Sequence, residues 1–309
     1  METNKPAKKA GMMKIILICA ICLMAVGAVI CIIISAISGI PKTEIKKHEE
    51  TLAISDNCDI RIINSTEDIN IYKTDESIAK ITYYDRFENN HIIVNNTDSL
   101  TFTAAEQAFS LFNNLINYTF DNTTTELYLP ANFTGKISIS STTGDIYIKD
   151  LSASTLTAKL TTGSIKAEST TTADMLLETT TGDMYINNLT SENVKCKSTT
   201  GDVQLIGVNA KAYIHCKAST GSISIYETNC GSVLSETTTG DIRIDKLSAD
   251  SIEFKATTGD VFGTIAGKEE DYRINVNSDT GLCTIHSKES GDKSLKAKTT
   301  TGDIDINFK

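Results

Sequence analysis

A Thr-Gly pair recurs through the second half of the chain at nearly constant spacing. Successive glycines lie 19 to 22 residues apart, each follows a threonine, from Thr143 to Thr301, and six of them precede an aspartate. A period of this length is typical of solenoids, in which each repeat is one turn of the chain and buries its apolar face only against neighbouring turns. The nine corner glycines are Gly144, Gly163, Gly182, Gly201, Gly221, Gly240, Gly259, Gly281 and Gly302.

Apolar and polar residues alternate on both sides of each glycine. Ile146 and Ile148 follow Gly144 at positions two and four, and Leu156 and Ala158 precede the next glycine by seven and five. A period of two with one apolar face is typical of a half-buried strand. Each repeat therefore predicts two short strands, and the constant phase predicts inner columns. One such column is Ala158, Leu177, Cys196, Cys216, Ser235, Phe254, Val276 and Ala297.

The repeat predicts an all-β fold, a single-stranded parallel β-helix (solenoid) of about nine 19–22-residue rungs over residues 136–309. We expect neighbouring rungs to lie about 4.8 Å apart and the coil to be right-handed from chirality preferences. No proline follows Pro130, as expected where strands pair on both edges. At the corner, glycine accepts a left-handed backbone, threonine bonds along the stack, and aspartate bonds the amides of its own turn.

An uncharged run precedes the repeats. Ile15 to Ile37 is long enough to cross a hydrocarbon core of about 30 Å and longer than the apolar region of a typical cleaved signal, although a cleaved signal remains the alternative. Lysines before the run favour a cytoplasmic N-terminus. We therefore expect a single-pass protein of the cell membrane with its C-terminal domain outside. Its parts are a cytoplasmic arm (1–14), a transmembrane signal anchor (15–37) and a stalk (38–50).

The region 51–135 lacks the period and is predicted to be a β-rich cap. It contains one candidate helix at 104–117, whose apolar residues fall on one face. Solenoids need atypical end segments, so we expect this helix to cover the open end of the core rather than to contact the membrane. The apolar residues of the candidate helix are Ala105, Ala108, Phe109, Phe112, Leu115 and Ile116.

The charge balance limits the partners. The formal net charge is −10, which argues against nucleic acid because phosphate binding needs a basic surface. The first 14 residues hold four lysines and one glutamate, so the rest of the chain carries −13. We expect that part to repel anionic lipids and wall polymers unless divalent cations intervene.

Five cysteines lie outside the apolar run, an odd number without regular spacing that predicts no disulfide framework. Cys196 and Cys216 fall on adjacent rungs, where core packing is favoured over a disulfide, and the redox state of the five stays open. They are Cys58, Cys196, Cys216, Cys230 and Cys283.

The repeats resemble a known bacterial family. The lead-in Leu-Tyr-Leu-Pro at 127–130, the segment 135–146 and the serial Thr-Thr-Gly-Asp-Ile motifs are similar to those of the family called "putative adhesin", a domain of unknown function. The resemblance covers roughly 54–309 and implies a single-chain β-helix, often membrane-anchored, as we expect here. It supplies no catalytic residue, and the family name does not establish a function.

Two columns are candidate sites. Carboxylates about 5 Å apart on adjacent rungs can share a calcium ion, but Ser164, Ser222 and Leu282 interrupt the aspartate column, so corner capping is favoured over metal binding. The four calcium candidates are Asp183, Asp202, Asp241 and Asp260. The outward column after the glycines places aromatic rings beside cations, an arrangement suited to stacking on sugars. Its candidate binding residues are Tyr147, Lys166, Tyr185, Arg243 and Phe262.

Other chemistry is weakly supported. Uniform rungs leave loops only at 263–272 and 286–294 for a polysaccharide-active enzyme, which needs a cleft with paired acidic residues. An ice-binding face is not expected, because adjacent threonines in a strand point to opposite faces.

The sequence therefore predicts a non-enzymatic, cofactor-free, adhesin-like or envelope-binding scaffold whose partner is wall glycan or a membrane protein. An envelope-stress sensor or an accessory subunit of a membrane complex is the alternative, and a polysaccharide-active enzyme is the minor alternative.

Overall fold

The computed structural model of the protein describes residues 27, 29, 30, 45–85, 91–104 and 123–309. The chain divides into two units, Met1–Ile45 with Gln107–Asp121, and Lys46–Glu106 with Asn122–Lys309. Nearly all of the first unit lies outside the described residues. Most of the predicted anchor 15–37 also lies outside the described residues, with only 27, 29 and 30 inside them. Of the candidate helix 104–117, only residue 104 is described. Within the described ranges, no helix is long and apolar enough to cross a membrane.

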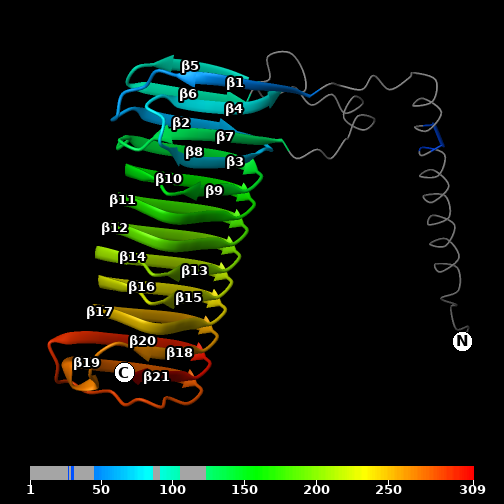
Figure 1. Cartoon of the computed structure of the whole chain (residues 1–309). Coiled ribbons are helices and arrows are strands. Elements are labelled where there is room, and N and C mark those ends of the chain that lie inside the picture. The colour runs from blue at the N-terminus through cyan, green and yellow to red at the C-terminus, as the bar shows by residue number, and fades with distance from the viewer. Residues whose placement is uncertain (1–26, 28, 31–44, 86–90, 105–122) are drawn as a thin grey trace, which may run out of the picture. The chain divides into compact units, whose positions relative to one another are not determined.

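The second unit is built from 21 strands that form one continuous hydrogen-bonded sheet. The sheet winds into a stack of turns (Figure 1). In chain order, the elements are β1 Lys46–Leu52, β2 Asp59–Asn64, β3 Asp68–Thr74, β4 Ala79–Asp85, β5 His91–Asn96, β6 Ser99–Ala104, β7 Thr124–Pro130, β8 Lys136–Thr143, β9 Ile146–Lys149, β10 Ser152–Thr162, β11 Ile165–Thr181, β12 Met184–Thr200, β13 Val203–Ile206, β14 Asn209–Thr220, β15 Ile223–Tyr226, β16 Asn229–Thr239, β17 Ile242–Thr258, β18 Val261–Ile265, the 3-10 helix η1 Glu269–Asp271, β19 Tyr272–Thr280, β20 Lys293–Thr301 and β21 Ile304–Phe308.

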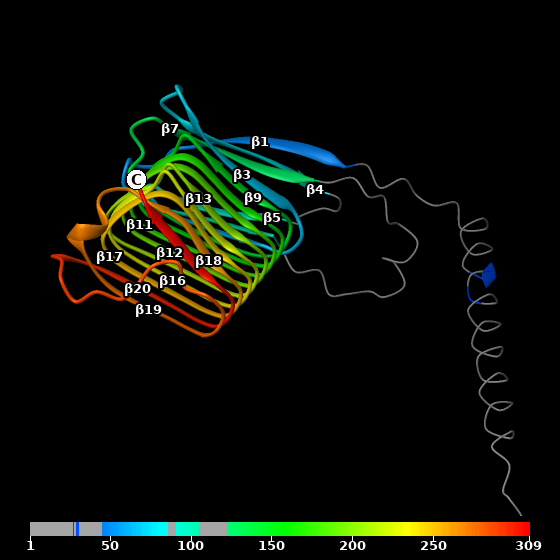
Figure 2. The ribbon, with the colours of Figure 1, turned by 90° about the horizontal axis from the view of Figure 1, so that it is seen from below.

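Each middle rung has three sides, not the two strands predicted. In β11 the inward residues alternate along 165–168, then along 170–172, and then along 174–181, and two consecutive outward residues mark each bend. These segments form the short side, the third side and the long side of one rung. The third side was missed because its inward residues in this rung, Thr170 and Thr172, are polar but buried. Seen from below, the turns lie over one another (Figure 2).

The bend between the short and third sides needs a left-handed residue. In the rungs from β9 to β17 this residue has a φ between 48° and 63°, a conformation that costs a non-glycine residue some free energy. Stacking places these residues in one column along the solenoid. They are Asp150, Ser169, Asn188, Gly207, Glu227 and Lys246.

The bend between the long and short sides carries the Thr-Gly corner. Gly201 has φ 139°, and a Cβ atom there would overlap the carbonyl oxygen of Gly182 in the preceding rung. Its N–H donates to the carbonyl of Thr220 in the next rung at 2.9 Å. The hydroxyl that bonds along the stack belongs to the residue three positions before glycine, such as Thr237, which donates to Gly221 at 2.9 Å. The threonine directly before each glycine, as Thr143 shows, is exposed instead.

The predicted inner column is confirmed with one change in its order. Strand register aligns Ala158 through Phe254 in the expected sequence. After Phe254, however, the next residue in space is Ala297, and Val276 follows it. The last rung of the chain is therefore not the last rung of the stack.

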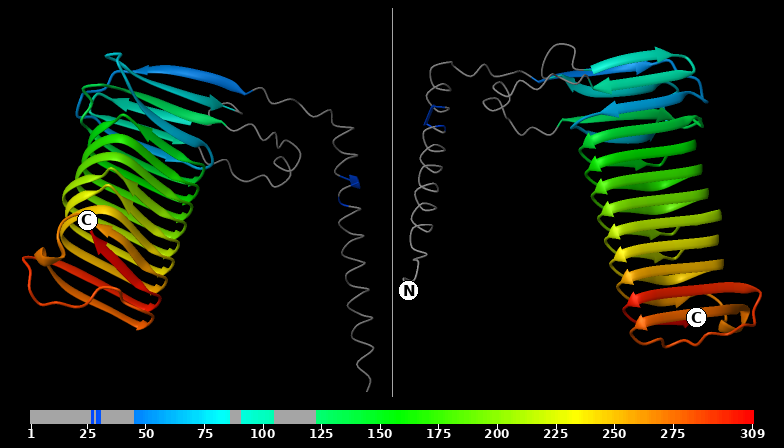
Figure 3. Two further views of the ribbon diagram at one scale, coloured as in Figure 1. Left: turned by 60° about the horizontal axis from the view of Figure 1, so that its bottom comes forward. Right: turned by 180° about the vertical axis from the view of Figure 1, so that it is seen from behind.

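At the C-terminal end, β20 lies between β17 and β19, and β21 pairs with β18. The outer strand β19 is covered in turn by a segment of its own loop, since Ile274 and Lys288 exchange two backbone hydrogen bonds of 2.7 Å. Both loop expansions, 263–272 and 286–294, lie at this end of the stack (Figure 3).

The N-terminal end shows the same displacement. β2 lies between β6 and β8, and β3 lies between β7 and β9. Beyond them, β4, β1 and β5 pair antiparallel. The region 51–135, predicted as an atypical cap, therefore contributes two further layers of parallel strands, β2 with β3 and β6 with β7, before the antiparallel strands end the parallel stack.

Candidate functional site

The outward residues that follow each corner align from rung to rung on the short side. The column runs Tyr147, Lys166, Tyr185, Gln204, Ser224, Arg243 and Phe262. The structure thus brings the five predicted binding residues into two groups separated by Gln204 and Ser224. We call Tyr147, Lys166 and Tyr185 the aromatic group.

Carboxylates orient the aromatic group. The Tyr147 hydroxyl donates to Glu168 at 2.6 Å, and burial together with this bond raises the pKa of Tyr147 to about 12. The ammonium of Lys166 lies 2.7 Å from the same carboxylate and 5.2 Å from the Tyr147 ring centroid. Tyr185 is 39% exposed and donates to Asp183 at 3.1 Å. Both phenol groups are therefore held in place, which lowers the entropy lost when a ligand stacks on them.

Two tyrosines that the sequence did not single out extend the aromatic group. The ring of Tyr72 lies 5.9 Å from that of Tyr147 and 5.4 Å from that of Tyr128. Tyr72 and Tyr128 sit on alternating strands, but nothing local to either strand shows that β3 and β7 stack above β9. Aromatic side chains consequently continue over the first rungs of the solenoid.

The second group consists of a cation and a ring. Arg243 donates to Asp241 at 2.8 Å, and its guanidinium carbon lies 5.6 Å from the centroid of Phe262. The ion pair fixes the guanidinium over the ring, a favourable cation–π geometry.

The corner aspartates bond to the neighbouring rung. Asp183 accepts the N–H of Asp202 at 2.8 Å, and Asp241 accepts that of Asp260 at 3.0 Å. The expected bond to amides of the same turn was therefore wrong. Asp202 and Asp260 make the same contact to the next rungs, which supports capping as their role. In the part of the chain that the structure describes, no three His, Cys, Asp or Glu side chains form a metal-binding group, and calcium binding stays a prediction.

The cysteines outside the apolar run are free thiols. Cys196 and Cys216 face each other on adjacent rungs and are buried. The hydrogen bond to Cys196 and the burial raise the pKa of Cys216 well above its ordinary value, so Cys216 packs against Cys196 as a neutral thiol.

A buried charged cluster at the N-terminal end was missed altogether. His91 lies 2.7 Å from Asp85 and 3.3 Å from Glu67, and its ring stacks on Phe102 at 5.1 Å. Burial lowers the pKa of His91, but the bonds to Glu67 and Asp85 outweigh it, and the pKa is raised. These residues come from three segments that meet only in the folded chain, so no spacing signals the cluster. It holds β4 and β5 to the loop between β2 and β3.

Three-sided turns, a glycine corner in each of nine turns and an interior of stacked apolar columns define the chain as a β-solenoid. Residues 57–307 match the model of the Toastrack family DUF4097, a domain of unknown function. The chain belongs to this family. No curated protein matches it significantly in sequence.

Solved structures are similar to the chain at low sequence identity, and the first of those named here shares its fold. A "putative lipid binding protein" from Parabacteroides distasonis aligns with a TM-score of 0.55 and 11% identity, over 85% of this chain and 97% of that chain. A "putative adhesin" from Bacteroides fragilis aligns with a TM-score of 0.48 and 13% identity, over 86% and 99%. Another "putative adhesin", from Parabacteroides merdae, aligns with a TM-score of 0.35 and 14% identity, over 85% of this chain and 96% of that chain.

Proposed function

We propose that this protein is a non-enzymatic, membrane-anchored binding module of the bacterial cell envelope, adhesin-like in architecture. The run 15–37 anchors it, with the N-terminus in the cytoplasm and the solenoid outside. Its ligand is a wall glycan that stacks on the aromatic group. The observation that carries the proposal is the alignment of the fixed Tyr147 and Tyr185 rings in one column, two rungs apart with Lys166 between them.

The chemistry of the short side suits a neutral sugar. Tyrosine rings offer apolar faces with a polar tip, and carboxylates beside them accept hydrogen bonds from sugar hydroxyls. The second oxygen of each carboxylate already has a partner, Lys166 for Glu168 and the N–H of Asp202 for Asp183, so a sugar hydroxyl would share these oxygens through their remaining lone pairs. These carboxylates bind neighbouring side chains and backbone amides, and they do not face each other across a cleft. This arrangement supports a non-enzymatic role.

The test is binding of the detergent-solubilised full chain to purified wall glycan. Replacing Tyr147 and Tyr185 together by alanine should weaken binding by about tenfold or more, since stacked aromatic side chains dominate such contacts. Tyr213→Ala, on the long side, is the matched control and should bind like the wild type. Absence of binding, or equal loss in the control, contradicts the glycan assignment. Because one fold neighbour is described as a lipid binding protein, neutral lipid vesicles form a second arm.

A second candidate function is accessory subunit of a membrane complex or envelope-stress sensor. Strand β5 carries Ile92 and Val94 at 54% and 51% exposure, and among the described strands it pairs only with β6. Exposed apolar residues on an edge strand favour a protein partner. A photo-crosslinking residue at position 94 should capture a specific membrane protein in cells, and capture of none counts against this function.

A further inference from the structure

Charge is separated between two sides of the solenoid. The long side exposes two central columns of outward residues, which we call the basic face. These columns hold seven lysines and three glutamates, although the whole chain carries a net charge of −10. The lysines are Lys159, Lys195, Lys197, Lys217, Lys255, Lys296 and Lys298, and the glutamates are Glu178, Glu236 and Glu253.

The short side and its two bends have the opposite balance, with eleven acidic and four basic side chains. The acidic ones are Asp145, Asp150, Glu168, Asp183, Asp202, Glu227, Asp241, Asp245, Asp260, Asp303 and Asp305, and the basic ones are Lys149, Lys166, Arg243 and Lys246. The negative net charge therefore does not describe the basic face, and the expected repulsion of anionic polymers does not apply there.

The densest part of the basic face lies on β12 and β14. Register places Lys195 beside His215 and Lys197 beside Lys217, at strand spacing of about 4.8 Å. Lys197 has no ion pair among the described residues, and the ammonium of Lys195 lies 5.4 Å over the ring of Tyr213. Like charges this close raise the local potential and attract anions.

Glutamates hold other lysines of the face in position. Lys159 lies 2.8 Å from Glu178, and Glu236 lies 3.3 Å from Lys255 and 3.8 Å from Lys217. These exposed pairs contribute little free energy, so an incoming anion competes with them at low cost.

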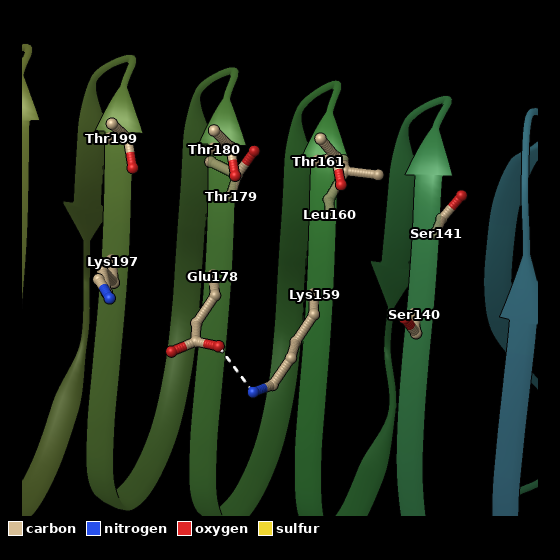
Figure 4. A pocket seen from close by; sticks show the side chains of 10 residues that line it. All are labelled: Ser140, Ser141, Lys159, Leu160, Thr161, Glu178, Thr179, Thr180, Lys197 and Thr199. Atoms are coloured by element: carbon tan, nitrogen blue, oxygen red, sulfur yellow. Dashed lines mark ion pairs between the residues drawn. The ribbon is translucent and has the colours of Figure 1, made fainter.

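The face is hollowed beside this cluster. A groove of about 240 Å³ is lined by Lys159, Glu178 and Lys197 together with hydroxyl groups of successive rungs. Figure 4 shows Thr161, Thr180 and Thr199 in a row above the Lys159–Glu178 pair. The rows of exposed hydroxyls offer donors to phosphate oxygens beside the cations.

We propose that the basic face binds a linear polyanion with a phosphate group in each repeating unit, laid along the solenoid axis. The column of Lys159, Lys197, Lys217, Lys255 and Lys298 spans six rung steps, about 30 Å, so it matches an extended chain of charges rather than one small anion. Surfaces that enter a bilayer carry exposed apolar side chains. Among the described residues, the large exposed apolar ones lie elsewhere, at Val29 and Ile30 in the apolar run, on β5, at Ile78, at Tyr185 and at Leu282. Their absence from the basic face favours a soluble polymer over a membrane as its ligand.

The test uses the full chain in neutral detergent and fluorescently labelled long-chain inorganic polyphosphate as the probe. The wild type should bind, with affinity falling steeply as salt rises. Lys197→Glu with Lys217→Glu should weaken binding about tenfold or more at low salt and reduce the salt slope by about 2. Lys149→Glu with Lys211→Glu makes the same charge change away from the face and should change affinity less than about twofold. Equal weakening in both variants, or no binding by the wild type, overturns the proposal.

Two further arms keep the result decisive. If the reversed variant unfolds by circular dichroism, Lys197→Gln with Lys217→Gln replaces it and should still weaken binding severalfold. Vesicles of phosphatidylcholine with about a third phosphatidylglycerol are compared with vesicles of phosphatidylcholine alone, because the proposed anchor enters both. A preference for the anionic vesicles that exceeds the binding to polyphosphate and is lost in Lys197→Glu with Lys217→Glu overturns the polymer assignment. The inference does not depend on the aromatic group, since the Tyr147 and Tyr185 double variant should bind polyphosphate normally. The experiments therefore distinguish failure of the glycan proposal from failure of the polyanion proposal.

Discussion

The middle and the ends of the solenoid use the same rung in different orders. From β8 to β17, each rung stacks on the one before it in sequence, and equivalent residues are 19 or 20 positions apart. At the ends, a rung is inserted between two others, so partners such as Asp68 and Asp145, or Asp260 and Asp303, are 77 and 43 positions apart. Regular repetition thus builds the length, and long-range insertion closes each end.

The insertion makes the ends cooperative. A rung at the end of an in-order stack has one neighbour and can fray alone. Here β20 has neighbours on both sides, and β19 depends on it. Antiparallel strands or loop segments then occupy the outer edge, which limits strand addition by other chains.

Deleting residues 293–309 should have the largest effect. The deletion removes β20 and β21 and with them the parallel partner of β19, so residues 261–292 should become sensitive to trypsin. Deleting 183–201, one complete middle rung of 19 residues, preserves the phase of every column and should leave a folded, shorter solenoid. Limited proteolysis with mass spectrometry distinguishes the two variants. An unchanged digestion pattern after the first deletion would show that β19 is held by other contacts.

Two glycines with positive φ, one at a corner and one in a loop, should separate backbone strain from steric overlap. In Gly201→Ala the new methyl overlaps the carbonyl of Gly182 and also needs φ 139°, so unfolding free energy should fall by about 3 kcal/mol or more. Gly267 has φ 119°, but no atom lies within 4 Å of the place that a Cβ would take. Gly267→Ala should therefore cost only about 1 kcal/mol. Denaturant titration measures both, and similar losses would disprove the stacking explanation.

The His91 cluster should give the N-terminal end its own pH dependence. The pKa of His91 is raised above 6.5 and that of Glu67 is lowered below 4.5 in the folded protein. The His91 contribution is therefore complete below about pH 6.5 and is lost as pH rises through the raised value. The Glu67 contribution is present above about pH 4.5 and is lost as pH falls through the lowered value.

The His91→Gln variant tests this dependence. As pH rises from 6.5 through the raised pKa of His91, the wild type should lose unfolding free energy on the order of 1 kcal/mol. The variant should lose less over the same pH range. Hydrogen exchange at β4 and β5 against β12 locates the change. A pH-dependent opening of β12 instead would place the effect outside the cluster.

Removing a corner aspartate should have the smallest effect on stability, and the loss should be equal in the middle and at the N-terminal end of the solenoid. Asp202 accepts the N–H of Ser222 at 2.7 Å, and Asp68 accepts that of Asp145 at 2.8 Å. Because the local geometry is the same, Asp202→Ala and Asp68→Ala should each cost about 1 kcal/mol. Thermal unfolding compares them, and addition or removal of calcium should shift neither if capping is the role. A calcium-dependent shift lost in Asp202→Ala would favour the metal hypothesis.

The middle of the solenoid was readable from the sequence because its information is local. Alternation around Gly201 assigns the inward residues, and a constant period assigns their neighbours. The same alternation at Ile60 and Ile62 in β2 identifies a strand but not its partners. The order in which the end rungs stack depends on how much apolar surface each arrangement buries. No local sequence pattern carries that information.

The surface was only partly predictable for a related reason. The column of Tyr147 and Tyr185 follows from the period, whereas its extension to Tyr72 requires the inserted rung. The basic face was missed because charge was summed along the chain. Lys197 and Lys217 are 20 residues apart in sequence but adjacent in space, so their combined potential is visible only when charges are summed by column.

The inserted C-terminal rung also affects how the chain matures. A ribosome releases the chain from its N-terminus, so middle rungs can stack as soon as each one emerges. β19 emerges before β20, yet its permanent neighbour is β20. Until residues 293–309 are available, β17 and β18 present an unfinished edge, and Tyr272–Thr280 has no parallel partner. Completion of this end therefore waits until β20 has emerged, and any delay in that step prolongs the interval in which the edge is open to chaperones, proteases or another copy of the chain.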